Sequence, residues 1–122
     1  MTFICRRQSD GKVLAERVRV ADTFWSRFRG LMLAPSLPLG EGLLIEPCTS
    51  IHMMFMRFAI DAVFLDAGNR VVALYSRLRP WLGVSGWHRN AVKVIELPAG
   101  TIEACSLCEN DLLSLESAAA TA

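Results

Sequence analysis

The stretch of sequence that decides the fold is 60–76, which reads IDAVFLDAGNRVVALYS. Its first part, 60–65, is apolar on both faces, which is typical of a strand in the interior of a sheet. The tetrapeptide at 66–69 has the composition of a tight turn, and 70–76 is again rich in strand-forming residues. The stretch therefore predicts a β-hairpin in which Asp61 is buried and needs a neighbouring group as a hydrogen-bonding or ion-pairing partner.

Other segments have the composition of strands. Residues 12–20 alternate apolar and charged side chains, as a half-buried strand does. The turn signal at 9–11 predicts that this strand forms a hairpin with a strand at 3–7. Further short strands are predicted at 43–46, 92–97 and 111–116.

Two short helices are also predicted. Apolar residues recur at helical spacing over 24–32, where Asp22 or Thr23 can cap the first turn. A second short helix is expected over 102–107. The pattern as a whole favours a mostly β protein of the α+β class, built as an antiparallel β-barrel or sandwich of about seven strands with the two helices packed against it.

Apolar residues are unusually frequent in this chain. Of its 122 residues, 52% are hydrophobic, and the mean hydropathy is +0.34. This composition argues against disorder and for a single domain, expected over 1–116 with a frayed tail at 117–122. It also predicts apolar surface beyond the core, either as a groove or as a surface for self-association, so that a homodimer is one of the expected possibilities.

The charges are almost balanced, with 13 basic and 12 acidic residues and a formal net charge of +1. Such a balance predicts no strong field, so nucleic acid is not an expected partner. The most apolar run, 53–65, contains Arg57 and Asp61, so no membrane span of roughly 20 apolar residues is expected. Because the N-terminus turns polar too early for an export signal, we expect a cytoplasmic protein, or one whose leader is absent from this sequence.

Several blocks of the sequence together resemble a known family. ADT at 21–23 and RGLM at 29–32 are followed by EGLLI at 41–45, IDAVFLD at 60–66 and ELPAGT at 96–101. In this order and at this spacing, the blocks resemble the family known as the domain of unknown function number one hundred and ninety-two. The resemblance implies a compact β-rich fold with helices, and it implies no established activity.

Cys48 and His52 are the first candidate site residues. On a helix their spacing would place both on one face, where they could ligate one metal ion, whereas on a strand they would lie roughly 13 Å apart. Pro47 disfavours a regular helix, so a buried thiol and a hydrogen-bonded histidine are the favoured interpretation. If a metal binds, we expect it at these two residues, and the sequence assigns no cofactor. The Cys105/Cys108 pair lacks the second close pair that a structural zinc site needs.

Asp61 is the second candidate, because a carboxylate in an apolar strand must be paired, hydrogen-bonded or protonated. Arg57 and Arg79 are its expected cationic neighbours. A tuned acid, base or ligand anchor and a structural ion pair or turn cap are interpretations that both stay open. Cys48, His52 and Asp61 could also form a thiol nucleophile with its base and orienting group, although no known nucleophile motif surrounds Cys48.

The loop at 77–90 is the third candidate region, because it combines arginines and tryptophans, with Arg79 and Trp81 close together. Such side chains can hold a small ligand or an anionic partner, or the tryptophans can seal the end of the barrel. We therefore expect a non-catalytic binding or accessory module whose groove, between the 78–90 loop and the 52–57 segment, holds a small ligand or a peptide. The alternative is a small enzyme or metal-binding protein that uses Cys48, His52 and Asp61, and the sequence does not decide between them.

Overall fold

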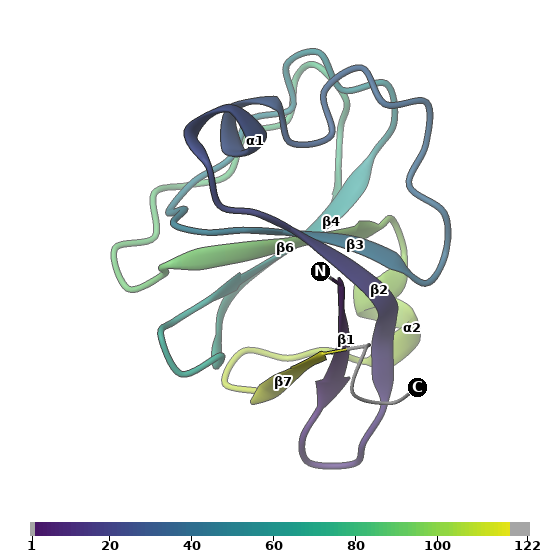
Figure 1. The fold of residues 1–122 in the computed structure, drawn as a ribbon, viewed down its shortest axis with the longest axis vertical. Helices are drawn as coiled ribbons and strands as arrows, with labels where there is room; N and C mark the ends of the chain where they lie inside the picture. Colours follow the sequence, from purple (N-terminus) through teal and green to yellow (C-terminus); the bar gives the residue numbers. More distant parts are fainter. Residues whose placement is uncertain (1, 118–122) are drawn as a thin grey trace.

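A computed structural model describes residues 2–117, with the backbone but not the side chains of Phe24 and Phe28. Within these residues the chain forms seven strands and two short helices (Figure 1). In chain order they are β1 (Thr2–Arg7), β2 (Val13–Ala21), α1 (Phe24–Arg29), β3 (Glu41–Ile45), β4 (Ile60–Leu65), β5 (Val71–Leu78), β6 (Lys93–Pro98), α2 (Thr101–Cys105) and β7 (Leu113–Ser117). Most predicted elements are therefore present within a few residues of their expected bounds. Residues 118–122 of the expected tail lie outside the described residues.

All seven strands belong to one sheet in the order β5-β4-β6-β3-β2-β1-β7. The predicted hairpin is confirmed, since β4 pairs antiparallel with β5, and β4 is an interior strand because β6 lies on its other side. The sheet curls into a half-barrel that stays open between its edge strands β5 and β7 (Figure 1). Among the described residues, a bridge between Arg70 and Leu112 joins the two edges at one end, with backbone hydrogen bonds from Val71 to Asp111 and from Leu113 to Asn69.

The expected antiparallel barrel or sandwich is wrong in two respects: the sheet is mixed, and it is open. β2 and β3 run parallel, with Arg17 opposite Glu41 and Ala21 opposite Ile45. Parallel neighbours need a crossover connection, and the long segment at 22–40, which contains α1, supplies one. The antiparallel expectation followed from the predicted hairpins, whereas β2 and β3 are joined by a helix and a long loop and not by a hairpin.

Alternation of side chains along the strands divides the core into two clusters, one on each face of the sheet. One cluster contains Val63 and Ile95 and is covered by Ile102 of α2. The other contains Phe64 and Val94 and is covered by the segments that follow α1 and β3, through Leu31, Leu37, Met53 and Met56. Successive residues of a strand point to opposite faces, so Asp61 of β4 points to the α2 face and Glu96 of β6 to the α1 face.

Asp61 is fully buried, and its carboxylate accepts three backbone N–H groups. Oδ1 accepts from Arg77 at 2.9 Å, while Oδ2 accepts from Gly100 at 3.1 Å and from Ile102 at 2.8 Å. The expectation that a neighbouring group pairs with the buried carboxylate is confirmed. Its partners are backbone amides and not the expected side chains of Arg57 and Arg79. The carboxylate thereby joins β4 to the end of β5 and to the start of α2.

The first helix has sharply defined ends. Thr23 and Ser26 form a capping box, in which Ser26 N–H donates to Thr23 Oγ1 at 3.1 Å and Thr23 N–H donates to Ser26 Oγ at 3.0 Å. Gly30 follows the helix with φ 48° and ψ −125°, a conformation that side chains strongly disfavour. Neither α1 nor α2 has the length and apolar character needed to cross a bilayer, and no other helix lies within residues 2–117.

Replacing Asp61 by alanine should destabilise the fold strongly. Three backbone N–H groups would lose the acceptor that the fully buried Asp61 provides, and the expected loss in the free energy of unfolding is about 3 kcal/mol or more. Asp66→Ala is the matched control, because Asp66 also accepts two backbone N–H groups, from Gly68 and Arg70, but in a turn that water reaches. Its expected loss is about 1 kcal/mol. Urea unfolding measures both, and equal losses would contradict the structural role assigned to Asp61.

Candidate functional site

A cavity of about 120 Å³ lies on the α1 face of the sheet. Its walls include Arg27 and Arg29 of α1, Gly30, and the segment that follows β3, with Cys48 and His52; Glu96 of β6 also lines it. The hydrogen bond from Cys48 N–H to the Val92 carbonyl, at 2.8 Å, holds this segment beside the start of β6. Groups from three separate parts of the chain therefore meet at one place.

Glu96 is the most unusual group in this cavity. Its side chain is only 4% exposed, and Oε1 has no hydrogen-bond partner among the described residues. Burial raises the pKa of Glu96 to about 7, because the charged form loses its hydration. Buried carboxylates are normally paired or hydrogen-bonded, so an unpaired one beside a cavity indicates a binding or catalytic group.

Gly30 allows the backbone to pass close to this carboxylate. A Cβ atom at Gly30 would lie 3.9 Å from Glu96 Oε1 and 3.8 Å from Ile45 Cδ1. The left-handed φ of 48° already favours glycine here. The turn after α1 therefore forms the wall of the cavity next to the carboxylate.

Cys48 is a half-buried thiol in the same cavity. Its Sγ donates to the Ser50 carbonyl at 3.1 Å. Burial raises the pKa of the Cys48 thiol, and the nearby Glu96 carboxylate acts in the same direction, whereas the Ser50 contact and Arg27 oppose the rise. The thiol is therefore mainly protonated at neutral pH, the opposite of what a thiolate nucleophile requires.

His52 is exposed at the edge of the cavity. Its Nδ1 accepts the Met54 N–H at 3.2 Å, an arrangement in which a neutral ring carries its proton on Nε2. Cys48 and His52 thus line one cavity. Across residues 2–117, however, no three His, Cys, Asp or Glu side chains are grouped as metal ligands would be.

The other candidate residues lie away from this cavity. Asp61 points to the opposite face of the sheet, so the structure does not bring it together with Cys48 and His52. Arg57, Arg79 and Trp81 are exposed and do not line the cavity, and Trp81, with 53% of its surface exposed, does not seal the barrel end.

The 52–57 segment and the 78–90 loop, between which a groove was expected, are joined by backbone hydrogen bonds. Met53 N–H donates to the Gly83 carbonyl at 2.8 Å, and Trp81 N–H donates to the Met53 carbonyl at 2.7 Å. The two segments therefore form one layer, and the cavity lies on the side of that layer that faces Glu96.

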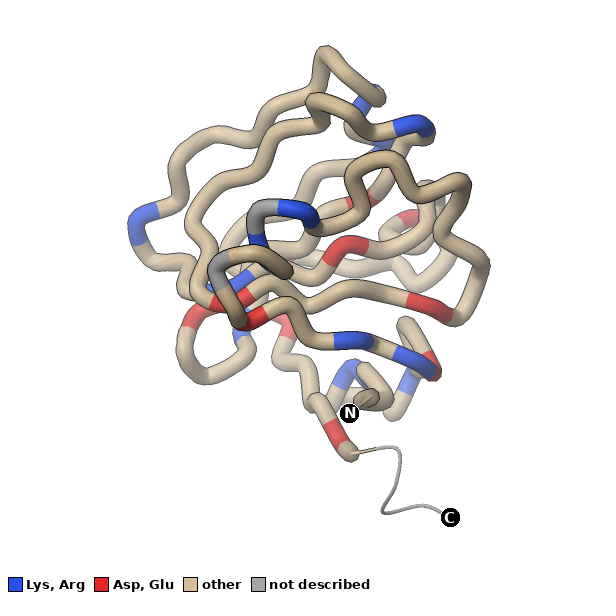
Figure 2. The backbone as a smooth tube through the Cα atoms, turned by 45° about the horizontal axis from the view of Figure 1, so that its top comes forward, with Lys and Arg blue, Asp and Glu red and all other residues tan. Residues whose placement is uncertain are grey.

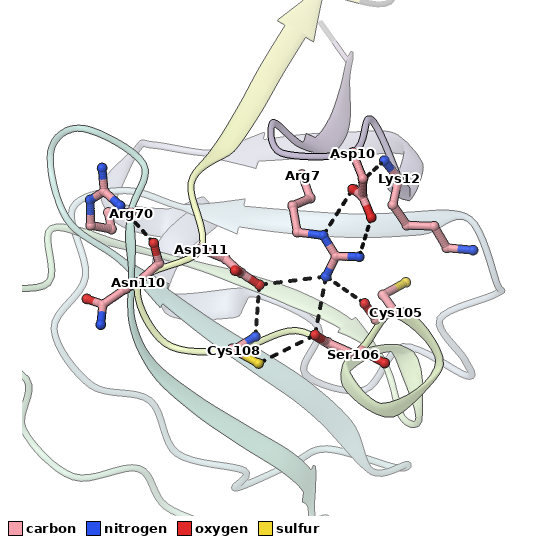
Figure 3. Close-up of polar contacts among 9 residues, drawn as sticks. All are labelled: Arg7, Asp10, Lys12, Arg70, Cys105, Ser106, Cys108, Asn110 and Asp111. Atoms are coloured by element: carbon pink, nitrogen blue, oxygen red, sulfur yellow. Dashed lines mark hydrogen bonds and ion pairs between the residues drawn. The ribbon is translucent and has the colours of Figure 1, made fainter.

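The Cys105/Cys108 pair belongs to a structural network around Arg7 (Figure 3). The Arg7 guanidinium donates to the Cys105 carbonyl at 2.7 Å and pairs with Asp10 at 2.8 Å and with Asp111 at 3.6 Å. Cys105 is buried and Cys108 is exposed. These contacts fix the end of α2 against the β1–β2 hairpin, and both cysteines are free thiols.

Sequence reasoning did not select Glu96, Arg27 and Arg29 as site residues. For Glu96 a signal was present, because an acidic residue inside the apolar strand at 92–97 has the property that singled out Asp61. Nothing in the sequence distinguished the two carboxylates, and only the backbone around each shows that Asp61 is satisfied and Glu96 is not.

The raised pKa of Glu96 should make the protein less stable as the pH rises. The folded state holds the proton more tightly than the unfolded chain, with a pKa of about 7 against the ordinary 4.5. This contribution is fully present below about pH 4.5 and is lost as the pH rises through 7. From about pH 5 to about pH 8, the free energy of unfolding of the wild type should fall by about 2 to 3 kcal/mol more than that of Glu96→Gln, as measured by urea unfolding. If the free energy of unfolding depends on pH in the same way for the two proteins, the pKa of Glu96 is not raised.

Comparison with solved structures shows that this fold occurs elsewhere. A protein of unknown function from Novosphingobium aromaticivorans superposes with a TM-score of 0.80 and 18% identity, covering 93% of this chain and 84% of that one. A structure from Sinorhizobium meliloti, described as a putative transcription regulator, also gives 0.80, with 20% identity and coverage of 93% and 91%. At these identities the likeness is one of fold alone.

Sequence relatives are found among archaeal proteins that carry no assigned activity. A UPF0127 protein of Thermococcus sibiricus is 42% identical over 79% of this chain and 64% of its own length. UPF0127 proteins of Pyrococcus furiosus and Thermococcus kodakarensis are 41% and 35% identical, over 84% and 88% of this chain and 90% and 69% of their own lengths. The chain thus spans less than two thirds of the Thermococcus sibiricus protein.

The resemblance seen in the sequence blocks is confirmed by a family model. The model of the domain of unknown function number one hundred and ninety-two, described as "Uncharacterized ACR", matches residues 5–115. Since this match covers nearly the whole chain, the protein belongs to that uncharacterised family.

Proposed function

We propose that the protein binds a small ligand in the cavity beside Glu96, as a non-catalytic binding module. The observation that carries the proposal is Glu96 Oε1, a buried acceptor with no partner in the described part of the chain. A ligand N–H or O–H donor placed against this oxygen would replace the hydrogen bond that the carboxylate lost on burial.

The cavity limits the size of the enclosed part of the ligand. Its volume of about 120 Å³ equals that of about four water molecules, and a cavity of about 150 Å³ accommodates benzene. The enclosed part of the ligand therefore has about four to six non-hydrogen atoms. Because the cavity is open on one side, a longer ligand could extend beyond it.

The charges around the cavity indicate which polar groups the ligand carries. Glu96 offers an acceptor in the interior, while Arg27 and Arg29 line the same cavity and offer donors. Arg27 is partly engaged, because its guanidinium donates to the carbonyls of Thr23 and Pro47, whereas Arg29 is exposed. A small molecule with an ammonium or hydroxyl group at one end and an anionic group at the other matches this arrangement.

Catalysis by a thiol is the alternative, and the site offers one feature in its favour. Cys48, His52 and Glu96 line the same cavity, and a carboxylate with a pKa of about 7 suits general acid–base chemistry. Against it stands the raised pKa of Cys48, which keeps the sulfur protonated. Binding is therefore the function that the geometry supports better.

Substitution of Glu96 by glutamine should weaken binding of small donor compounds. The probes are glycine, ethanolamine and β-alanine, with acetate and propionate as matched acids that lack the amine. The amines should shift the backbone NMR signals of Gly30, Cys48 and Glu96, and Glu96→Gln should reduce their affinity about tenfold. The exposed Glu103→Gln serves as the control. If no amine shifts these signals, or if both variants bind alike, the proposal fails.

Alkylation by iodoacetamide separates binding from thiol catalysis. At about pH 8, exposed Cys108 should react first and half-buried Cys48 more slowly, since burial keeps the Cys48 thiol protonated. Cys5 should stay unmodified until the protein unfolds, because burial raises its pKa to about 12. Peptide mass spectrometry measures the order. A Cys48 that reacts before Cys108 would favour the thiol enzyme instead.

A further inference from the structure

The arginines are strongly segregated from the acidic residues, although the net charge is close to zero. Three segments, 23–38, 48–59 and 79–92, contain five arginines and no aspartate or glutamate. The rest of the chain holds eight basic and all twelve acidic residues, a formal net charge of −4. Figure 2 shows the consequence, since the loops at the top carry Lys or Arg but no Asp or Glu. The molecule therefore has one positive end.

Large apolar side chains are exposed at the same end. Trp25 is 74% exposed, Leu33 64%, Phe55 45% and Trp81 53%. A shallow apolar hollow is lined by Trp25, Leu33 and Phe55 together with Arg29, and the Phe55 and Trp81 rings lie 5.2 Å apart. These residues form one continuous surface, called here the loop face. Exposed apolar surface of this kind marks an interaction site.

The backbone holds three of these side chains in an unfavourable conformation. Leu33, Phe55 and Trp81 have φ values of 63°, 65° and 67°, in the left-handed region that bulky residues rarely occupy. Each comes from a different one of the three segments. Glycine or asparagine would suit such positions better, so stability of the fold does not explain the presence of leucine, phenylalanine and tryptophan there.

We propose that the loop face docks the protein onto an anionic lipid bilayer. Tryptophan, phenylalanine and leucine are the side chains that enter the headgroup region, where amphipathic rings are favoured. Arginines pair with lipid phosphates, and the negative remainder of the chain turns the positive end toward an anionic surface. Apolar side chains that project from three separate loops suit a fluid surface, which adapts to each of them, better than a rigid protein partner.

Sedimentation with vesicles tests the proposal directly. The purified chain should sediment with phosphatidylcholine vesicles that contain about one third phosphatidylglycerol, and at least tenfold less with pure phosphatidylcholine. High salt should weaken the binding, since it screens the arginines. Brominated lipids should quench the tryptophan fluorescence, because Trp25 and Trp81 would lie among the acyl chains or headgroups.

Two sets of variants separate docking from folding. Leu33→Gly with Phe55→Gly and Trp81→Gly should bind at least tenfold more weakly, while the melting temperature stays unchanged or rises. Leu39→Gly is the apolar control, because Leu39 is 82% exposed beside Gly40 and Lys12, away from the loop face. Arg57→Gln with Arg79→Gln tests the charges, and Arg6→Gln with Arg17→Gln removes the same charge elsewhere.

Three results would overturn the proposal. They are equal sedimentation with neutral and anionic vesicles, no sedimentation with either, and binding that both loop-face variants leave unchanged. Should the triple glycine variant fail to fold, the arginine variants and the salt dependence of the wild type decide the question. The second of these results has one specific form. If the chain binds polyglutamate but not vesicles, and the loop-face variants weaken that binding, the loop face docks an acidic protein partner instead.

Discussion

The carboxylate of Asp61 joins three parts of the chain that are far apart in sequence. It accepts N–H groups from the end of β5 and from both sides of the start of α2, and the carboxylate itself is fully buried. Arg77 and Gly100, two of the donors, have φ values of 54° and 97°, so the backbone is bent to meet the carboxylate. With α2 held in this way, one face of the sheet is closed and the cluster around Val63 and Ile95 is sealed.

The opposite face is closed less completely, and this difference produces the candidate site. There the sheet is covered by the turn after α1 and by irregular segments, which leave a cavity beside Glu96. Glu96 pairs with Ala62 across the β4–β6 ladder. Ala62 follows Asp61 in the sequence, so Glu96 and Asp61 point to opposite faces of the sheet. The Asp61 carboxylate is satisfied by three amides, while Glu96 Oε1 has no partner among the described residues. That contrast is the reason why Glu96, and not Asp61, is proposed to bind a ligand.

The sequence blocks that resemble the family acquire physical roles in this arrangement. Gly30, in the RGLM block, brings the backbone beside Glu96, which opens the ELPAGT block. Gly100, in that same ELPAGT block, donates to Asp61 of the IDAVFLD block. The ELPAGT block therefore meets the RGLM block on one face of the sheet and the IDAVFLD block on the other. Arg29 lines the cavity beside Glu96 and also borders the apolar hollow of the loop face, so this cavity and the proposed docking surface share a wall.

The sequence by itself determined the strands, the 60–76 hairpin and the burial of Asp61, and it limited the cap of α1 to Asp22 or Thr23. Periodicity, turn chemistry and capping act between residues close together in the chain. Only the tertiary structure decided that β2 and β3 run parallel, that the sheet stays open, and that Glu96 meets Cys48 and Gly30. These outcomes depend on contacts between distant segments and on the face to which each strand residue points. Asp61 and Glu96 look alike in the sequence, because each is an acidic residue in an apolar strand. Backbone amides from distant segments satisfy Asp61, whereas Oε1 of Glu96 is left without a partner among the described residues.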